Sequence, residues 1–280
     1  MEHAFVSRNL PRLIILERMS YARHPDCPRA LALAHRLADT ARAIARQHFR
    51  SPIAVEQKAD RTPVTIADRA IETEMRRMIR AEFPSHGISG EEFAAEAGSE
   101  FTWVLDPIDG TKSYISGYPL FGSLIALTLG ARAVLGIIEA PAQSERWVGI
   151  EGAPSECNGA LARTSACASI EQARVYSTTT DAFDGARLRR YEAYSRRALM
   201  RRFGGDCYLY GLLASGHCDL VIEAAMKPHD FQALVPIVEG AGGKISDWNG
   251  RALDASSGDS VLAASSQALW AQAVEALSDR

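Results

Sequence analysis

Three acidic clusters hold the residues of this chain whose types and spacing could do chemistry together. They are Gly90-Glu91-Glu92, Asp106-Pro107-Ile108-Asp109-Gly110-Thr111 and Lys227-Pro228-His229-Asp230. Asp106 follows an apolar run, where an unpartnered carboxylate costs several kcal/mol unless a cation or hydrogen-bond donors compensate it. Pro107 fixes a bend, so Asp106 and Asp109 can turn inward together while the Ile108 carbonyl adds a neutral oxygen. Ligands that are all oxygen favour Mg²⁺ or Mn²⁺ over softer metals.

Each cluster taken alone has an ordinary structural explanation. An Asp-Pro pair is usually a turn, and a Glu-Glu pair is usually a solvated helix end. Together they favour a shared metal centre. Such a centre supplies the charge neutralisation and the activated water that hydrolysis of a doubly anionic phosphate monoester requires. Backbone N–H groups of Gly110 and Thr111, at an expected helix start, could hold the phosphate oxygens.

With Gly240-Ala241-Gly242-Gly243 downstream, these clusters resemble the inositol-monophosphatase superfamily of metal-dependent phosphatases. The resemblance extends from Arg29 to the C-terminus. It implies an α+β or α/β fold, a layered αβαβα sandwich with the metal ions at the junction of its halves, and usually a homodimer. It also implies two or three Mg²⁺ ions per site, or Mn²⁺ in their place, with Glu91, Asp106, the Ile108 carbonyl, Asp109 and Asp230 as ligands.

The same resemblance assigns the catalytic residues. It implies that the Thr111 hydroxyl, with the Asp68 carboxylate behind it, orients a water for in-line attack on phosphorus, and that Glu91 takes part beside them. Lys58 and Asp60 match the family's stretch near a mobile metal site. The residues implied to contact the phosphate end of the substrate are Gly110, Thr111 and Asp230.

The substrate prediction depends on the downstream half of the chain. The stretch 201–223 resembles the histidinol-phosphate phosphatase branch of the superfamily, as does 112–117. Inositol-specific members typically carry small residues after the glycine of this stretch, where this chain has Asp206. Histidinol phosphate carries an ammonium group and an imidazole, which carboxylates can recognise. We therefore expect Asp206 and Glu223 to contact the organic part, with Arg201 near the substrate or across a dimer interface.

The expected reaction is Mg²⁺-dependent hydrolysis of L-histidinol phosphate to L-histidinol and inorganic phosphate, a step of histidine biosynthesis. One alternative is an inositol-1-phosphate or broad-specificity sugar-phosphate phosphatase on the same scaffold. Another, of a different class, is a non-catalytic regulatory or RNA-polymerase-associated protein that has kept the fold. Two residues also have ordinary alternatives, Asp206 as the N-cap of a helix and Glu223 as a surface charge at a strand end.

Composition restricts the remaining classes. The 280 residues are 47% hydrophobic and 23% charged, which is ordinary for a globular chain. The formal net charge of −3 gives no basic field of the kind that non-specific nucleic-acid binding needs. The five scattered cysteines form no CxxC pair and are expected to be reduced thiols. No apolar stretch suits a signal peptide or a membrane span, so we expect a cytoplasmic protein without nucleic-acid or membrane partners.

The elements that must position the clusters follow from apolar periodicity. Helices are predicted over 29–49 and 66–83, the second begun by a capping box of Thr65 and Asp68 and ended by Pro84. In the first half, strands are predicted at 101–105, 124–129, 134–140 and 147–150. In the second half, strands at 174–177, 220–223, 244–247 and 260–264 alternate with helices at 208–214, 231–239 and 266–277.

These elements divide the chain into three parts. Residues 1–28 show little periodicity and are expected to form a disordered extension. An α+β half over 29–160 carries most of the metal ligands. An α/β half over 161–280 carries the substrate-selecting residues and the last metal ligand.

Overall fold

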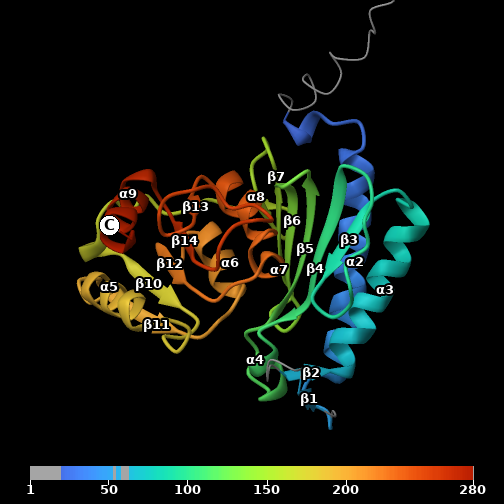
Figure 1. Ribbon diagram of the computed structural model, residues 1–280, viewed down its shortest axis with the longest axis horizontal. Helices are drawn as coiled ribbons and strands as arrows, with labels where there is room; N and C mark the ends of the chain where they lie inside the picture. Colours follow the sequence, from blue (N-terminus) through green and yellow to red (C-terminus); the bar gives the residue numbers. More distant parts are fainter. Residues whose placement is uncertain (1–19, 53–54, 58–62, 280) are drawn as a thin grey trace, which may run out of the picture.

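The computed structural model describes residues 20–52, 55–57 and 63–279. Figure 1 shows two large β-sheets, with helices outside each of them and between them. In the described chain, one sheet has the strand order β3-β4-β5-β6-β7-β8-β9 and the other the order β11-β10-β12-β14-β13. The first sheet comprises β3 (Gly87–Gly90), β4 (Phe101–Asp109), β5 (Gly122–Leu129), β6 (Arg132–Ala140), β7 (Glu145–Ile150), β8 (Glu156–Cys157) and β9 (Ala160–Leu161). The second comprises β10 (Arg174–Ser177), β11 (Met200–Phe203), β12 (Leu220–Glu223), β13 (Lys244–Ser246) and β14 (Val261–Ala264).

The first sheet is an antiparallel meander from β4 to β9, with β3 added in parallel at one edge. The four strands predicted for the first half all lie in it. The second sheet is mixed, because β10, β11 and β12 run parallel while β14 is antiparallel to both β12 and β13. Its four predicted strands are also present. The first sheet ends at Leu161, just past the boundary between halves expected at residue 160.

Alternation of side chains along the strands divides the interior into three cores. On β4, Trp103 and Leu105 face a core shared with two helices, α2 (Cys27–His48) and α3 (Ile66–Glu82), whereas Val104 faces the opposite way. On β12, Val221 faces the same middle core as Val104, while its neighbours Leu220 and Ile222 face a third core. The middle core holds α6 (Tyr208–Ala214), α7 (Pro228–Phe231) and α8 (Leu234–Gly240), and the third holds α5 (Gly185–Ser195) and α9 (Gln267–Leu277). The order of layers is therefore αβαβα, which confirms the predicted fold.

The first helix begins earlier than the sequence pattern indicates. α2 starts at Cys27, and its stripe of leucines and alanines is buried against the first sheet. Before it, Tyr21 is only 2% exposed within a 3-10 turn, and the Ser20 hydroxyl donates to the Glu151 carbonyl over 2.7 Å. The expected end of the extension at residue 28 is therefore wrong, because residues 20–28 pack on the first half. Residues 1–19 lie outside the described chain.

The second helix has the predicted start and end. In α3, the Thr65 side chain accepts from the backbone of the first turn, and Asp68 accepts from the Thr65 N–H, which completes the capping box. The helix ends at Glu82, two residues before Pro84. Two short strands, β1 (Val55–Gln57) and β2 (Pro63–Thr65), pair just ahead of it. Lys58 and Asp60, which match the family's stretch near a mobile metal site, lie outside the described residues.

Three features of the second half differ from the sequence prediction. The helix predicted over 231–239 is two helices, α7 and α8, because Pro236 lacks an N–H and is tolerated in the first turn of α8 but not in mid-helix. The helix α5 and the edge strand β11 were not predicted. Both are rich in arginine and bury few apolar residues, so they carry little periodic signal.

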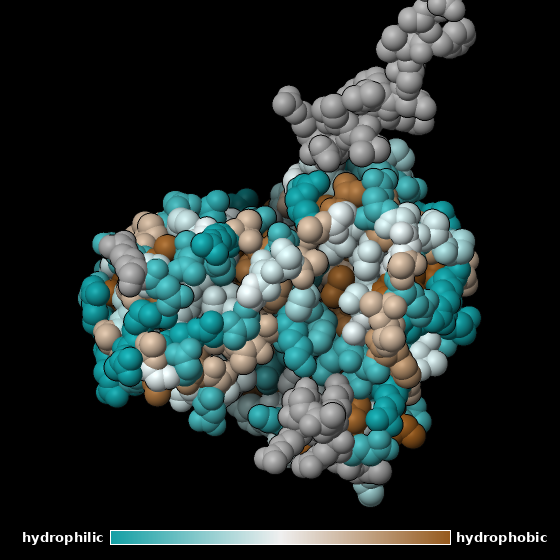
Figure 2. All heavy atoms as spheres, in the orientation of Figure 1, coloured by the Kyte–Doolittle hydropathy of each residue, from teal (hydrophilic) through white to brown (hydrophobic). Residues whose placement is uncertain are grey.

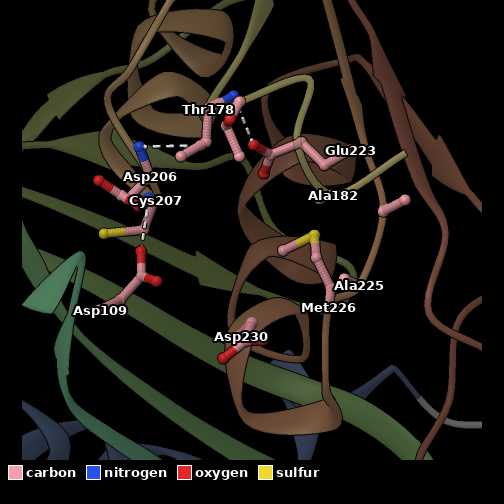
Figure 3. A pocket seen from close by; sticks show the side chains of 11 residues that line it. Asp109, Thr178, Ala182, Asp206, Cys207, Glu223, Ala225, Met226 and Asp230 are labelled. Carbon is pink, nitrogen blue, oxygen red and sulfur yellow. Dashed lines mark hydrogen bonds between the residues drawn. The ribbon is translucent and has the colours of Figure 1, made fainter. Parts of the chain in front are cut away.

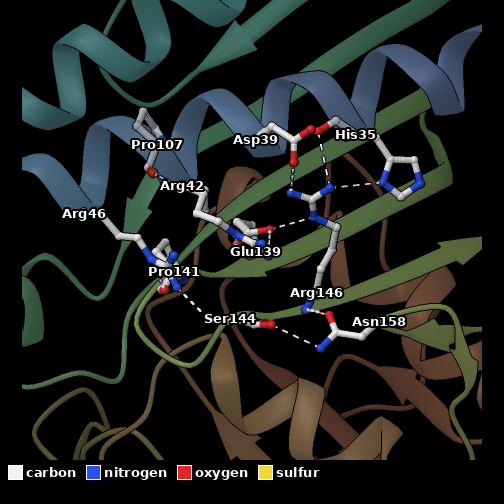
Figure 4. A network of polar contacts seen from close by, with 11 residues as sticks. His35, Asp39, Arg42, Arg46, Pro107, Glu139, Pro141, Ser144, Arg146 and Asn158 are labelled. Atoms are coloured by element: carbon white, nitrogen blue, oxygen red, sulfur yellow. Dashed lines mark hydrogen bonds and ion pairs between the residues drawn. The ribbon is translucent and has the colours of Figure 1, made fainter.

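A buried ionic network joins the outer helical layer to the first sheet (Figure 4). Glu139 on β6 is fully buried and accepts from Arg42 of α2 over 2.9 Å and from Arg146 of β7 over 2.6 Å. Arg146 also donates to Asp39 on α2 over 2.6 Å. One carboxylate thus has two cationic partners from two layers. The network therefore connects α2 to β6 and β7 of the first sheet.

The surface of the molecule is expected to be mostly polar, because the apolar residues lie in the three cores. Figure 2 shows mostly hydrophilic side chains on the face in view, with apolar ones scattered among them. None of the helices in the described part of the chain is long and apolar enough to cross a membrane.

Candidate active site

A cleft of about 470 Å³ lies where the end of β4 meets the second half of the chain. It is lined by all the residues that the sequence analysis assigned as metal ligands, and by the expected catalytic threonine: Glu91, Asp106, Ile108, Asp109, Asp230 and Thr111. A smaller hollow of about 190 Å³ adjoins it and shares Asp109, Asp206 and Asp230 with it. In Figure 3, Asp206 and Glu223 lie on opposite sides of this hollow, with Thr178 between them. The acidic clusters, far apart in sequence, therefore converge on one place.

An irregularity in β4 brings Asp106 and Asp109 to the same side. Residues three apart on a regular strand point to opposite faces. Here the pairing of β4 with β5 shifts register between Asp106 and Asp109, as in a β-bulge. The buried Ser123 hydroxyl of β5 donates to the Pro107 carbonyl over 2.5 Å and fixes the irregular segment. The register shift thus lies at Pro107, where a bend was expected, and Ser123 supports it.

The third carboxylate comes from the start of a short helix. Asp230 lies in α7, where its Oδ2 accepts from the Lys227 N–H over 2.7 Å and its Oδ1 lies 3.3 Å from His229 Nε2. Oxygen atoms of Asp106, Asp109 and Asp230 all lie within 4.8 Å of one another. Such a separation allows one cation to contact all three carboxylates.

The electrostatics of this cluster indicate missing positive charge. Burial raises the pKa of Asp106 well above its ordinary value, and the nearby charges of Glu91, Asp109 and Asp230 raise it further. Burial also raises the pKa of Asp109 well above its ordinary value, and the charges of Asp206 and Asp230 add to the effect. The mutual repulsion can be relieved by protonation or by a cation. Each carboxylate thus makes the charged form of its neighbours less favourable.

The donors also fit a hard divalent metal. Asp106 is 2% exposed, and its Oδ1 is buried without a hydrogen-bond partner. An orphaned buried carboxylate oxygen beside two other carboxylates is the environment that Mg²⁺ or Mn²⁺ would satisfy. Asp109 is held by one hydrogen bond, from the Cys207 N–H to Oδ2 over 2.5 Å. Asp106 therefore has an unsatisfied oxygen, whereas Asp109 and Asp230 each accept a backbone N–H.

Thr111 and Asp68 have other partners in this structure. Thr111 begins α4 (Thr111–Ile115), and its hydroxyl donates to the Ile108 carbonyl over 3.0 Å. Asp68 is fully buried, and its Oδ2 accepts from the Thr65 N–H and hydroxyl over 2.9 and 2.6 Å. Its Oδ1 is buried without a hydrogen-bond partner. The expected pairing of Thr111 with Asp68 stays a prediction.

Asp206 lies against the start of α4, across the junction of the halves. Its backbone has φ +47°, a left-handed conformation unusual for a residue with a side chain, and its Oδ2 accepts from the Ser113 hydroxyl over 3.1 Å. A Cβ on Gly110, at φ +82°, would lie 2.8 Å from that oxygen, so glycine is required there. Burial raises the pKa of Asp206 to about 6, against the lowering effect of the Ser113 hydrogen bond. The alternative of an N-cap is wrong, because Cys207 occupies that position of α6.

Glu223 ends β12 inside the smaller hollow. It is 7% exposed, so the alternative of a surface charge is wrong. The Thr178 N–H donates to its Oε1 over 2.8 Å, and the Tyr210 hydroxyl donates to its Oε2 over 3.1 Å. Burial raises the pKa of Glu223 to about 7, although the Thr178 hydrogen bond lowers it. Glu223 is thus a buried acid held at the wall of a cavity.

Arg201 lies apart from these residues. It belongs to the edge strand β11 and lines neither the cleft nor the hollow. Its guanidinium donates to Glu192 over 3.0 Å and to the Ser195 hydroxyl over 3.1 Å. The structure therefore does not bring Arg201 together with the other expected substrate residues, and its role across a dimer interface stays a prediction.

Two residues that contact Glu223 escaped the sequence analysis, Thr178 and Tyr210. Thr178 lines both cavities, donates its N–H to Glu223 and accepts the Asp206 N–H at its hydroxyl over 3.1 Å. The signal was available, because Thr178 follows a predicted apolar strand as Asp106 does. Tyr210, in contrast, lies within a helical apolar pattern that gave no reason to single it out.

Comparisons with known proteins agree with this geometry. A sequence model described as the Inositol monophosphatase family matches residues 29–279. The chain is 42% identical over 262 residues to the bifunctional phosphatase IMPL2, chloroplastic, of Arabidopsis thaliana, covering 90% of this chain and 76% of that protein. It is 38% identical over 224 residues to a histidinol-phosphatase of Chlorobaculum parvum, covering 79% of this chain and 86% of that protein.

A solved structure is similar to this chain in both fold and sequence. An inositol monophosphatase from Zymomonas mobilis superposes with a TM-score of 0.83 at 43% identity, covering 93% of this chain and 99% of that one. The match includes both sheets and the helical layers on either side of them, because it spans nearly the whole described chain. On the family match, the identities and the convergent carboxylates, the chain belongs to the inositol monophosphatase family and is a metal-dependent phosphatase.

Proposed function

We propose that this phosphatase hydrolyses L-histidinol phosphate to L-histidinol and inorganic phosphate, as in histidine biosynthesis. The observation that carries the proposal is the pair of carboxylates in the hollow that adjoins the acidic cluster, partly buried Asp206 and buried Glu223. An organic group with an ammonium and an imidazole supplies the positive charge that these two acids lack. Inositol offers only hydroxyls. The 38% identity to a protein named histidinol-phosphatase supports the same choice.

We propose Mg²⁺ as the metal, with Mn²⁺ as a substitute. The proposed ligands are Glu91, Asp106, the Ile108 carbonyl, Asp109 and Asp230, all of which line the cleft. When bound, the ions neutralise the phosphoryl oxygens and lower the pKa of a water molecule. The orphaned Oδ1 of Asp106 supports this assignment.

The chain's own residues would orient the attacking water. In the proposed role, the Thr111 hydroxyl accepts a proton from the water at Oγ1 and passes its own proton to Asp68. The unpartnered Oδ1 of Asp68 is the acceptor that this transfer needs. Thr111 must then exchange its present hydrogen bond to the Ile108 carbonyl for one to Asp68. That exchange also releases the Ile108 oxygen for its proposed role as a ligand.

The phosphate and the organic group would occupy different ends of the cavity. We propose that the phosphate contacts the N–H groups of Gly110 and Thr111 and lies beside Asp230. The organic group would extend toward Asp206 and Glu223. The four proposed ligand carboxylates would thereby act on metal and phosphate, whereas the pair Asp206 and Glu223 would act on the alcohol.

The test compares kcat/KM for histidinol phosphate with kcat/KM for inositol 1-phosphate. The variants are Asp206→Asn, since asparagine tolerates a positive φ, and Glu223→Gln, which keeps the shape of the side chain. Loss of a hydrogen bond to a charged group corresponds to about 1.5–3 kcal/mol, so the preference for histidinol phosphate should fall about 10- to 100-fold in each variant. Glu171→Gln, at an exposed residue paired with Arg197, is the control and should keep the wild-type preference.

An unchanged preference in both variants would show that the specificity proposal is wrong. The panel should include fructose 1,6-bisphosphate and adenosine 3′,5′-bisphosphate, because an inositol-1-phosphate or sugar-phosphate phosphatase is the second candidate. The 43% identity to an inositol monophosphatase favours that candidate. A homodimer and a cytoplasmic location stay predictions, and sedimentation equilibrium of the purified chain tests the first.

A further inference from the structure

The inner face of α3 carries a buried glutamate and arginine that the mechanism above does not use. Glu72 is fully buried and Arg76 is 3% exposed. They follow Asp68 at intervals of four residues, so all three side chains project from one face of the helix. Arg76 Nε donates to Glu72 Oε1 over 2.8 Å. A fully desolvated pair of this kind contributes little net stability compared with apolar residues of the same size.

Glu72 holds the backbone on both sides of Glu91. The Glu92 N–H donates to its Oε2 over 2.8 Å, and the Phe93 N–H donates to its Oε1 over 3.3 Å. On the other side of Glu91, a Cβ built on Gly90 would lie 2.0 Å from Glu72 Oε1, so the carboxylate packs directly on the glycine. The residue between these two contacts is the proposed metal ligand.

Arg76 fastens the rest of the same segment. Its Nη2 donates to the Phe93 carbonyl over 3.1 Å, and its Nη1 donates to Glu96 over 2.7 Å. The backbone of Glu96 in turn pairs with Ile88 of β3, with N–H to O distances of 2.7 and 3.0 Å. Segment 90–96 is therefore attached to α3 by side chains and to β3 by backbone.

We propose that Glu72 is a positioning residue that fixes the carboxylate of Glu91 toward the metal cluster. The inference rests on the proposed function in one respect, that Glu91 is a ligand. An ion pair kept only for packing would need Glu72 to face Arg76. Here the carboxylate also accepts two amide N–H groups of the segment that bears Glu91. Groups that orient metal ligands from behind commonly change metal affinity 10- to 100-fold when they are removed.

The experiment measures Mn²⁺ binding to the full-length, metal-free protein by isothermal titration calorimetry, without substrate. In Glu72→Gln, the new amide N–H₂ must replace either Oε2, which accepts the Glu92 N–H, or Oε1, which accepts Arg76 and the Phe93 N–H, so one set of contacts is lost. The Mn²⁺ Kd should rise at least tenfold. Hydrogen exchange at the Glu92 amide should become faster. At saturating Mn²⁺, kcat should return toward the wild-type value, because Glu91 itself is intact.

Glu74→Gln is the matched control on the same helix. Glu74 is partly exposed and pairs only with the exposed Arg77 among its described ion pairs, so the Kd of this variant for Mn²⁺ should stay within about twofold of wild type. The double variant Glu72→Gln/Arg76→Met removes the buried cation that has lost the Glu72 charge and separates stability from positioning. It should unfold at a higher temperature than Glu72→Gln, while its Mn²⁺ affinity stays weak.

Two outcomes would refute different statements. If the folded double variant binds Mn²⁺ as tightly as the wild type, Glu72 does not position the ligand and the inference is wrong. If Glu91→Gln also binds Mn²⁺ as tightly as the wild type, the assignment of Glu91 as a ligand fails, and with it that part of the proposed function. If Glu91→Gln binds Mn²⁺ more weakly than the wild type while Glu72→Gln binds it equally tightly, only the positioning role of Glu72 is rejected.

Discussion

The substitution Glu223→Gln should make the fold more stable above neutral pH while impairing the recognition of substrate. The carboxyl is 7% exposed, and burial raises its pKa from 4.5 to about 7. A raised pKa means that the native state binds the proton more tightly than the unfolded state does. The stability that this proton contributes is fully present below pH 4.5 and is lost as the pH rises through about 7. Each pKa unit corresponds to 1.36 kcal/mol, so the loss amounts to about 3 kcal/mol.

Glutamine removes this pH dependence and keeps most of the contacts. Its carbonyl can accept the Thr178 N–H, and its amide can donate to the Tyr210 hydroxyl. The free energy of unfolding of the variant, minus that of the wild type, should therefore increase by about 3 kcal/mol between about pH 4.5 and 8. Urea titrations followed by circular dichroism measure this difference. A chelator in every sample keeps the carboxylates of the metal cluster in the same state in both proteins.

A difference that does not change with pH would refute the reasoning, since it would mean that Glu223 ionises alike in the native and unfolded chains. The expected sign has a functional meaning. An acid that costs stability at the pH of the cell, and whose removal improves the fold, is one that function rather than folding explains. Addition of histidinol, which carries the ammonium but no phosphate, should stabilise the wild type above pH 7 and leave the glutamine variant unchanged.

Three further substitutions test the site and its supports. Asp106→Asn should abolish divalent-dependent phosphate release. Its unfolding in urea should stay cooperative, because the substitution removes one negative charge from a cluster of acids that repel one another. Turnover that persists in excess chelator contradicts the metal assignment. Gly90→Ala should destabilise the fold by about 1–3 kcal/mol and weaken Mn²⁺ binding, because its Cβ would overlap the Glu72 carboxylate. Arg146→Met should cost about 3 kcal/mol in urea unfolding without changing metal affinity, because it takes one of two cations from the fully buried Glu139.

Much of the fold could be predicted from local pattern because most elements bury one clear face. The strands at 124–129 and 134–140 lie almost wholly in the interior, and α2 buries a regular stripe. The apolar pattern of each segment therefore matches the element that it forms. α5 could not be found in this way. Its buried residues are two tyrosines and a serine among arginines, and its helical state depends on packing against α9. β3 is short and ends in glycine, and its pairing with β4 decides its structure.

The candidate site was predictable only in part, for a similar reason. Asp106 and Asp109 share a motif, and a bend after Asp106 was expected to turn them to one side. The support of that bend by Ser123 depends on the neighbouring strand, and nothing in the local sequence indicates it. Glu72 was equally hidden, because its partners Glu92 and Phe93 come from a segment twenty residues away in sequence. The supporting roles of Ser123 and Glu72 can be seen only from contacts between elements, and not from residue type.

Hydrogen-bond partners separate the acids that hold the fold together from those available for chemistry. Asp219 is 1% exposed, and burial acts to raise its pKa, yet hydrogen bonds from Arg174 and Ser165 outweigh burial and the pKa is lowered. Asp106 is buried to a similar extent, but its Oδ1 has no partner and its pKa is raised. Burial alone therefore does not identify a functional carboxylate. An acid that is buried, unsatisfied and surrounded by other acids is stable as an anion only with a cation, and this requirement connects the geometry of the cluster to metal-dependent phosphate chemistry.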